Sequence, residues 1–338
     1  MKYAHISGGN FGDDINSWIW EKLRPGNWEN STEHILLGIG SPLGPKLDDG
    51  KTWYVLGAGA GYKKPHDLST LPNWKIFAVR GPLSAIALGL AEDKAVTDGA
   101  ILLGSIPEFK RLPSEERSGI IFIPHHRAAS SGDWESICAE AGLGYVDPRW
   151  DSVRVIEAIR SSSLVISGAM HAAIIADTMR VRWVPVTTSS MVNQFKWLDW
   201  TLSMGVPYNP IDVGPSSISE KIEDLQFRLS MGPGMSDQST ETALRYLRRR
   251  SKGQVRSKGQ LANLRYYACW RLGNSTRWIL RRRILKPLNS RLDDKHSRRA
   301  ILRLIEASEN EGFLSSENMF NEKLSSMTER LDALVSHD

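Results

Sequence analysis

The chain has 338 residues, of which 41% are hydrophobic and 24% are charged, and this composition excludes wholesale disorder, collagen-like repeats and coiled coils. The length suits two domains with an appendage better than one core. The two cysteines, Cys138 and Cys269, lie far apart without a CxxC spacing, which disfavours a disulfide framework or a zinc cluster. With no signal-peptide pattern and no long apolar stretch, we expect a cytoplasmic protein, soluble or peripheral to a membrane.

The net charge of +5 is distributed unevenly along the chain. Residues 241–300 hold 18 Lys and Arg against 3 Asp and Glu, whereas residues 1–240 hold 22 against 27 and residues 301–338 hold 3 against 8. A mildly acidic body therefore carries a basic arm. This arm is the candidate for contact with a polyanion or an anionic membrane.

Short apolar runs rich in β-branched residues alternate with Gly-containing loops and with segments of helical spacing, which is typical of parallel sheets in α/β proteins. Strands buried on both faces give such continuous runs. We expect strands at residues 3–6, 34–38, 53–56, 75–79 and 95–97, and then at 119–123, 144–146, 164–167 and 181–185. We expect helices at residues 15–23, 82–90, 134–141, 152–161 and 171–179.

The polar loop 107–118 separates two such series of elements, and we place a domain boundary near Leu112. Two doubly wound domains, residues 1–112 and 113–236, are expected to face each other across a cleft. The loops at the carboxyl ends of both sheets would then surround one ligand site.

Residues 237–338 are expected to form a helical extension that is first basic and then acidic. Within it, residues 261–283 read as a basic amphipathic stretch with Trp and Tyr at its margins. From Asp293 onward the sequence predicts one or two ordinary polar helices.

The first candidate site is the loop GGNFGDD, which follows a predicted strand and opens a predicted helix. Its glycines let the backbone approach a ligand, so Asn10 and Gly12 are candidate contacts. The loop is neither a GxGxxG nor a Walker pattern, which gives a nucleotide assignment weak support. Asp13 and Asp14 are candidate general acids or bases, although aspartate at such a position commonly caps the helix.

Two basic clusters also follow predicted strands. The guanidinium of Arg80 offers a planar fork of donors to a carboxylate or phosphate, with a surface salt bridge as the alternative. His125, His126 and Arg127 concentrate donors at the end of the strand 119–123, and one histidine could simply bond to backbone. Metal binding is disfavoured there, because adjacent side chains point apart.

His171 begins a helix directly after a small-residue turn at the end of the strand 164–167. That position predicts a place at the cleft, with anion contact and proton transfer as its tasks, and a satisfied core histidine is the alternative. Lys196 is a secondary anion candidate. The tryptophans beside it could stack on sugars or fill the core.

Taken together, these motifs resemble the polysaccharide pyruvyl transferase family, in particular the ketal pyruvate transferases of xanthan and succinoglycan assembly. The resemblance implies two Rossmann-like domains in a GT-B-like arrangement. It also implies phosphoenolpyruvate as donor, a pair of sugar hydroxyls as acceptor and a cyclic ketal as product. We expect no cofactor and no metal. The motifs that carry it occur in order: Gly9-Asn10-Phe11-Gly12-Asp13-Asp14, Val79-Arg80-Gly81-Pro82-Leu83-Ser84, Leu88-Gly89-Leu90, Thr97-Asp98-Gly99-Ala100, Pro124-His125-His126-Arg127, Gly168-Ala169-Met170-His171 and Ala176-Asp177.

Many family members carry an Arg-Leu-His triplet that binds the donor. Here the triplet is Ala-Met-His, so His171 carries over and the arginine does not. We therefore nominate Arg80, Arg127 and His126 for the donor anion. His171 is expected to act as the acid and to meet the leaving phosphate, and Asp13 or Asp14 is expected to deprotonate a hydroxyl.

The resemblance further implies exopolysaccharide biosynthesis with lipid-linked oligosaccharides as acceptors at the inner face of the cytoplasmic membrane. The basic arm suits anionic headgroups there. A helix packed on the body is the main alternative for the arm, and nucleic-acid binding is less favoured. A GT-B-like nucleotide-sugar glycosyltransferase and a non-catalytic binding protein of the same fold remain the alternative functions.

Overall fold

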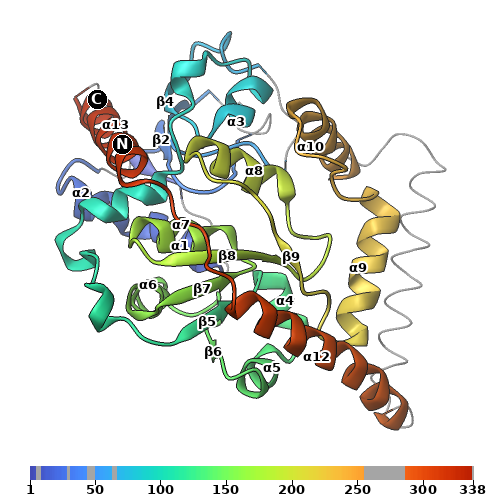
Figure 1. Cartoon of the computed structure of the whole chain (residues 1–338). Coiled ribbons are helices and arrows are strands. Elements are labelled where there is room, and N and C mark those ends of the chain that lie inside the picture. Colours follow the sequence, from blue (N-terminus) through green and yellow to red (C-terminus); the bar gives the residue numbers. More distant parts are fainter. Residues whose placement is uncertain (5–8, 29–30, 44–49, 63–66, 255–285, 337–338) are drawn as a thin grey trace.

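Two parallel sheets organise the chain, whose computed structural model describes residues 1–4, 9–28, 31–43, 50–62, 67–254 and 286–336 (Figure 1). The first sheet has four strands in sequential order: β1 (Lys2–Tyr3), β2 (His34–Leu37), β3 (Thr52–Leu56) and β4 (Trp74–Ala78). The second sheet has five strands in the order β6 (Gly144–Tyr145), β5 (Ile120–Ile123), β7 (Leu164–Ser167), β8 (Arg182–Thr187) and β9 (Ile211–Asp212). The predicted α/β class with parallel strands is therefore confirmed, and the two sheets fit two Rossmann-like units.

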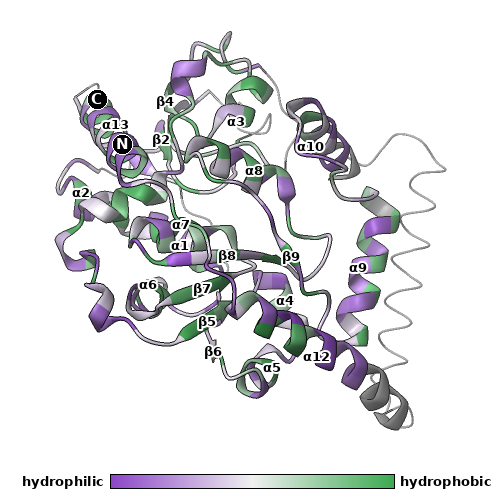
Figure 2. Cartoon of the chain, viewed as in Figure 1, coloured by the Kyte–Doolittle hydropathy of each residue, from purple (hydrophilic) through white to green (hydrophobic). Residues whose placement is uncertain are grey.

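Helices connect the strands and surround both sheets (Figure 1). The first half of the chain is the part that contains the first sheet, and the second half begins at β5. The helices of the first half are α1 (Phe11–Asp14), α2 (Ile19–Leu23) and α3 (Pro82–Ala87). The second half holds α4 (His126–Ser131), α5 (Trp134–Glu140), α6 (Ser152–Ser161), α7 (Met170–Thr178), α8 (Gln194–Ser203), α9 (Ile218–Met231), α10 (Thr240–Gln254), α12 (Lys286–Ser308) and α13 (Glu317–Val335). Figure 2 shows β5 and β7 in the hydrophobic colours, whereas α9 and α12 carry many hydrophilic residues.

Helix α7 occupies the centre of the molecule. All nine of its residues are buried, because it packs on β7, β8 and α6 of the second half and on the 3₁₀ helix Gly99–Ser105 of the first half. A helix covered on every side needs no polar face, which agrees with its apolar and small residues. His171 in its first turn therefore lies between the two halves.

The helices after Ser236 are part of the packed structure. Tyr246 of α10 and Met327 of α13 are buried in the same hydrophobic core as the strands of the first sheet. Helix α13 packs on β3 and β4 although it lies at the far end of the sequence. Two helices, α12 and α13, follow where one or two were predicted. The domain boundaries near Leu112 and Ser236 stay predictions, and the stretch 261–283 lies outside the described residues.

Some predicted elements have other bounds in the structure, such as the helix predicted at residues 15–23, which is observed as a 3₁₀ helix at Ile15–Ser17 and as α2. The strand predicted at residues 95–97 is reduced to a single parallel bridge between Val79 and Ala95, because the chain turns directly into the 3₁₀ helix. The strand predicted at residues 3–6 overlaps β1 at Tyr3, and residues 5–6 lie outside the described residues. Within the described part of the chain, no helix has the length and apolarity needed to span a bilayer.

Candidate functional site

A cavity of about 340 Å³ lies where loops of the two halves meet. The polar side chains that the first half contributes to its lining are those of Asn10, Asp13, Asn16, Ser41 and Tyr62. The polar and charged side chains from the second half are those of His125, His126, Arg127, His171, Asn193, Lys196 and Arg250. Motifs that lie far apart in the sequence thus share one cavity.

The order of the second sheet explains why the histidines meet. The chain passes from β5 outward to β6 and then returns to β7 on the other side of β5, so the strand order reverses between β5 and β7. Ligands of open α/β sheets bind beside such a reversal, at the carboxyl ends of the strands. His125 and His126 follow β5, and His171 follows β7.

His171 is held closely by the loop from the first half. A Cβ atom placed on Gly12 would lie 1.9 Å from Nδ1 of His171, so only glycine lets the backbone of α1 approach the ring. On the ring's other edge, Nε2 of His171 lies 4.0 Å from Oδ2 of Asp98. The imidazole therefore lies between the two halves, close to Gly12 and Asp98.

Opposing effects act on the proton affinity of His171. Burial lowers its pKa, and the carboxylates of Asp98 and Asp13 work in the opposite direction. Burial raises the pKa of Asp98, whereas the charge of His171 lowers it. Asp98 is not among the predicted site residues. The signal that could have found it is the one charged residue between Ala95 and Leu103, within the motif Thr97-Asp98-Gly99-Ala100.

The structure separates the two adjacent candidates of the first loop. Asp13 lines the cavity, where its Oδ2 accepts a hydrogen bond of 2.7 Å from Nδ2 of Asn10. Asp14 does not belong to the cavity lining. Of the two, Asp13 is therefore the carboxylate that a ligand can reach.

The second half gives the cavity a positive wall. Nζ of Lys196 lies 4.8 Å from the ring centroid of Tyr62 and 3.5 Å from its hydroxyl oxygen, and this charge lowers the pKa of Tyr62. Arg250 of α10 donates to the carbonyl of Met191 at 3.1 Å and stacks over Phe227, which fixes its charge at the wall. Arg127 supplies a third permanent cation.

The paired histidines belong to the same wall. Their rings are 4.3 Å apart, and Nδ1 of His125 accepts the backbone N–H of Arg127 at 3.4 Å, which caps α4. Burial and the neighbouring positive charges lower the pKa of His125 and of His126. Among the described residues of the lining, Asp13 is the one carboxylate, so the cavity favours an anionic ligand.

Arg80 occupies a different place from the one predicted. Its side chain is fully buried and donates to Asp199 at 3.1 Å, to the hydroxyl of Ser41 at 2.7 Å and to the carbonyl of Ala60 at 2.6 Å. It therefore lies behind the cavity wall, where it orients Ser41 and ties the end of β4 to α8. Arg80 is thus not part of the cavity lining, and the direct anion contact expected of it stays a prediction.

The polar lining residues that were not predicted are Asn16, Ser41, Tyr62, Asn193 and Arg250. Asn193 donates to the carbonyl of Gly61 at 2.7 Å, while its Oδ1 is buried without a partner among the described residues. Arg250 follows the predicted end of the second domain, so only the packing of α10 brings it here.

Comparisons with known proteins place the chain in a family. No family model matches the sequence, and no solved structure matches it. The succinoglycan biosynthesis protein ExoV of Rhizobium meliloti (strain 1021) is 41% identical to the chain over 219 residues, which cover 64% of this chain and 69% of that protein. The aligned share of both chains is too large for one common motif to explain. The chain therefore belongs to the family of the succinoglycan biosynthesis protein ExoV.

Proposed function

We propose that the protein is a pyruvyl transferase of exopolysaccharide biosynthesis, which moves the pyruvyl group of phosphoenolpyruvate onto a sugar of a lipid-linked oligosaccharide and forms a cyclic ketal. The similarity to a succinoglycan biosynthesis protein supports a role in making such a polysaccharide. The observation that carries the reaction is a cationic cavity that also holds a histidine and a carboxylate, His171 and Asp13.

The cavity suits a small, doubly anionic donor. Phosphoenolpyruvate carries a carboxylate and a phosphate, and charge-assisted hydrogen bonds from Arg and Lys are the strong contacts for both groups. Arg127, Lys196 and Arg250 would bind these groups together with His126, in place of the arginine that the triplet lacks. A volume of about 340 Å³ is at the lower end of the range of roughly 300–1,000 Å³ for small-molecule sites.

The reaction balances with acid–base chemistry alone. A proton adds to the methylene carbon of the donor, and one sugar hydroxyl attacks the neighbouring carbon, which has become oxocarbenium-like. The bond to phosphate breaks, and the second hydroxyl closes the ketal. Of the two protons that the hydroxyls lose, one ends on the new methyl group and the other on the phosphate, so no oxidant or reductant is required.

His171 and Asp13 would divide these proton transfers. His171 would donate to the methylene carbon, and Asp13 would accept the proton of the attacking hydroxyl. Burial lowers the pKa of His171 in the free protein. A bound dianion beside the ring would raise that pKa, because a nearby negative charge favours the protonated imidazole. Binding of the donor would thus promote protonation of His171, the general acid of the proposed reaction.

The first test is phosphate release from phosphoenolpyruvate by the purified full-length protein, with and without a lipid-linked oligosaccharide extract. Thermal shifts with phosphoenolpyruvate and with nucleotide sugars are measured in parallel. We expect acceptor-dependent phosphate release and stabilisation by phosphoenolpyruvate. Stabilisation by a nucleotide sugar, with no response to phosphoenolpyruvate, would instead assign the protein to the glycosyltransferases.

We also propose that the protein works as a cytoplasmic protein at the inner membrane face, because a lipid-linked acceptor resides there. The basic stretch 261–283 supports this with its arginines and aromatic residues. Sedimentation of the full chain with vesicles is expected to require anionic lipid and to weaken when the arginines between residues 261 and 283 are replaced by glutamine. Equal sedimentation with purely zwitterionic vesicles would contradict it.

A further inference from the structure

Two buried polar atoms face each other just behind the cavity. Nε2 of His171 and Oδ2 of Asp98 are 4.0 Å apart, and neither has a hydrogen-bond partner among the described residues. Asp98 is fully buried and His171 is 5% exposed. A buried polar atom without a partner costs about 1–3 kcal/mol. Two such atoms side by side therefore indicate a contact that a small movement completes.

The other oxygen of Asp98 is already engaged. Oδ1 accepts the backbone N–H of Ala100 at 3.1 Å and so caps the 3₁₀ helix that begins at Gly99. This cap fixes the carboxylate within the first half, with Oδ2 directed at the ring from the second half. The capping role accounts for the hydrogen bond of Oδ1 but gives Oδ2 no partner.

The ring of His171 reaches the cavity by its other edge. His171 is part of the cavity lining, whereas its Nε2 is sealed from solvent. Nδ1 lies on the edge next to Gly12, where a side chain would fill the space. A neutral imidazole has one nitrogen that donates and one that accepts, and the partner of one nitrogen decides the state of the other.

We propose that Asp98 is a positioning residue that accepts a hydrogen bond from Nε2–H of His171 and thereby makes Nδ1 the atom that exchanges a proton with the ligand. The pairing itself is independent of the reaction, and its use in proton transfer rests on the proposed pyruvyl transfer. In that transfer, Nδ1–H gives its proton to the methylene carbon of the donor, and the neutral ring keeps Nε2–H on Asp98.

The charges around the ring give this pairing a second effect. Asp98 and Asp13 favour the protonated imidazole, whereas Lys196 and Arg80 disfavour it, and burial disfavours it most. Removing the charge of Asp98 would leave the two cations and burial opposed by Asp13 alone. Protonated His171 would then form only at lower pH.

The tautomer of His171 can be read directly by ¹⁵N NMR on the full-length protein labelled at its histidines. The chain has 8 histidines, and the signals lost in His171→Gln identify the ring. We expect neutral His171 in the wild type to carry its proton on Nε2. In Asp98→Asn the amide can donate to Nε2, so we expect the proton on Nδ1 and titration at lower pH.

Asp151→Asn is the matched control. Asp151 also caps a helix, since its Oδ1 accepts the backbone N–H of Val153 at 3.0 Å, but it lies outside the cavity lining. We expect this variant to leave the tautomer and the titration of His171 unchanged. If Asp98→Asn behaves like Asp151→Asn, then Asp98 is a cap only and the proposal is overturned. A wild-type ring with its proton on Nδ1 would overturn it too.

Activity separates this inference from the proposed function. If the wild type releases phosphate from phosphoenolpyruvate, we expect Asp98→Asn to reduce turnover by about 10²–10⁴-fold and to move the alkaline limb of the pH profile to lower pH. Normal turnover in Asp98→Asn would refute the positioning role while the transferase assignment stands. The expected tautomers in a protein that never releases phosphate would support the pairing and refute the transferase.

Discussion

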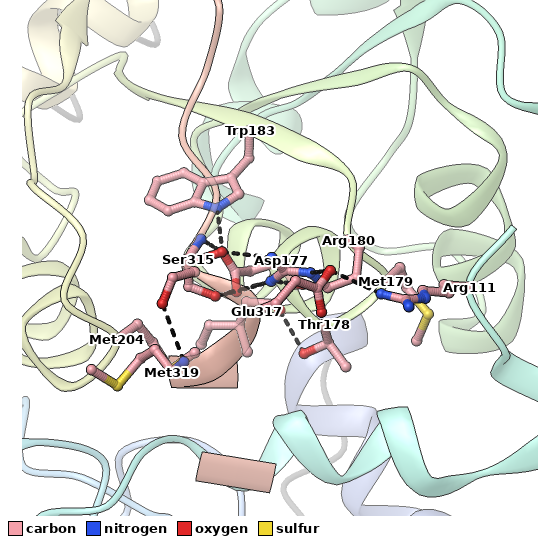
Figure 3. Close-up of polar contacts among 12 residues, drawn as sticks. Arg111, Asp177, Thr178, Met179, Arg180, Trp183, Met204, Ser315, Glu317 and Met319 are labelled. Carbon is pink, nitrogen blue, oxygen red and sulfur yellow. Dashed lines mark hydrogen bonds and ion pairs between the residues drawn. The ribbon is translucent and has the colours of Figure 1, made fainter. Parts of the chain in front are cut away.

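The two ends of α7 carry buried polar clusters of opposite character. At its carboxyl end, both oxygens of Asp177 are satisfied: Ser315 donates its backbone N–H at 2.8 Å, Trp183 donates at 3.1 Å and Arg180 donates at 3.4 Å (Figure 3). At its amino end, Nε2 of His171 and Oδ2 of Asp98 have no partner among the described residues.

This difference separates buried polar groups whose hydrogen bonds are complete from buried polar groups that lack a partner among the described residues. The cluster around Asp177 ties α7 to the segment that leads into α13, and Glu317 extends it to Arg111 in the predicted linker (Figure 3). Both carboxylate oxygens of Asp177 accept hydrogen bonds in the folded chain, so the cluster contributes to the stability of the fold. The pair at the amino end leaves bonding capacity unused and lies beside a cavity. Substitutions at the amino end are therefore expected to affect activity, and substitutions at the carboxyl end are expected to affect the free energy of unfolding.

The largest expected effect is on activity, at the amino end. If the proposed transfer is correct, His171→Gln lowers turnover by about 10²–10⁴-fold, because glutamine cannot deliver a proton. Thermal stabilisation by phosphoenolpyruvate is expected to persist, since the cations remain. His296→Gln on α12, away from the cavity lining, is the control. Near-wild-type turnover in His171→Gln would remove this residue from the chemistry.

At the carboxyl end, the expected effect is on stability. Asp177→Ala removes one of the two carboxylates that pair with Arg180 and leaves the buried donors of Trp183 and Ser315 without an acceptor. This should lower the free energy of unfolding by about 3–5 kcal/mol. Chemical denaturation measures this loss. The control is Asp332→Ala, which breaks the exposed ion pair with Arg24 and should cost under about 1 kcal/mol. Equal losses in the two variants would contradict the structural role of the cluster.

A methyl group at Gly12 tests how the loop holds the amino end. Because a Cβ there would lie 1.9 Å from Nδ1 of His171, Gly12→Ala must displace the ring or the loop. Overpacking of this kind costs about 1–3 kcal/mol, and turnover should fall with it. In Gly104→Ala the nearest atom would be Cζ of Phe320 at 3.3 Å, so this control should lose less of both. Unchanged turnover in Gly12→Ala would show that the ring position is not critical.

Removal of the lysine charge tests the positive wall with two independent measurements. Lys196→Met should raise the KM for phosphoenolpyruvate about tenfold with little change in kcat, as expected when uniform binding is lost. It should also raise the pKa of Tyr62, because Lys196 is the main cause of its lowering. Ultraviolet titration against Tyr62→Phe resolves that shift, with Lys22→Met as the control. A KM and a titration that both stay constant would contradict a donor site beside Lys196.

Local sequence patterns predicted the elements around α7 well. The helix α6 was predicted with its observed bounds, because its apolar residues keep helical spacing. Helix α8 was missed, since seven of its ten residues are buried and little periodic contrast remains. The two-residue strand β9 gives no pattern at all.

The site could be predicted only in part, because local sequence patterns do not show long-range contacts. Loops after parallel strands converge at one edge, so Asp13, His126 and His171 could be expected near one another. Arg80 also follows a parallel strand, but its side chain forms an ion pair with Asp199. Asp199 lies 119 residues further along the chain, so no local sequence pattern predicts this contact. Arg250 reaches the cavity only through the packing of α10. The contacts missed are those that long-range packing decides.

The smallest effect expected is the pH dependence of stability at the amino end. Burial lowers the pKa of His125, of His126 and of His171 in the folded chain, so below about pH 6.5 the unfolded chain binds more protons. The free energy of unfolding should therefore fall as the pH falls, by at most about 1.4 kcal/mol per pH unit for each histidine.

His125→Gln isolates one contribution, because the pKa of His125 is lowered furthest below its ordinary value. Urea denaturation at pH 7.5 and at pH 5.5 should show a smaller difference between the two pH values for this variant than for the wild type. A general loss of stability from the cap on α4 would lower both values equally and leave that difference unchanged. An identical pH dependence in the two proteins would show that the cavity accepts a charged His125. The amino end of α7 would then have more access to water than the buried cluster at its carboxyl end. In that case the two ends of α7 would differ in solvent access and not in unused bonding capacity.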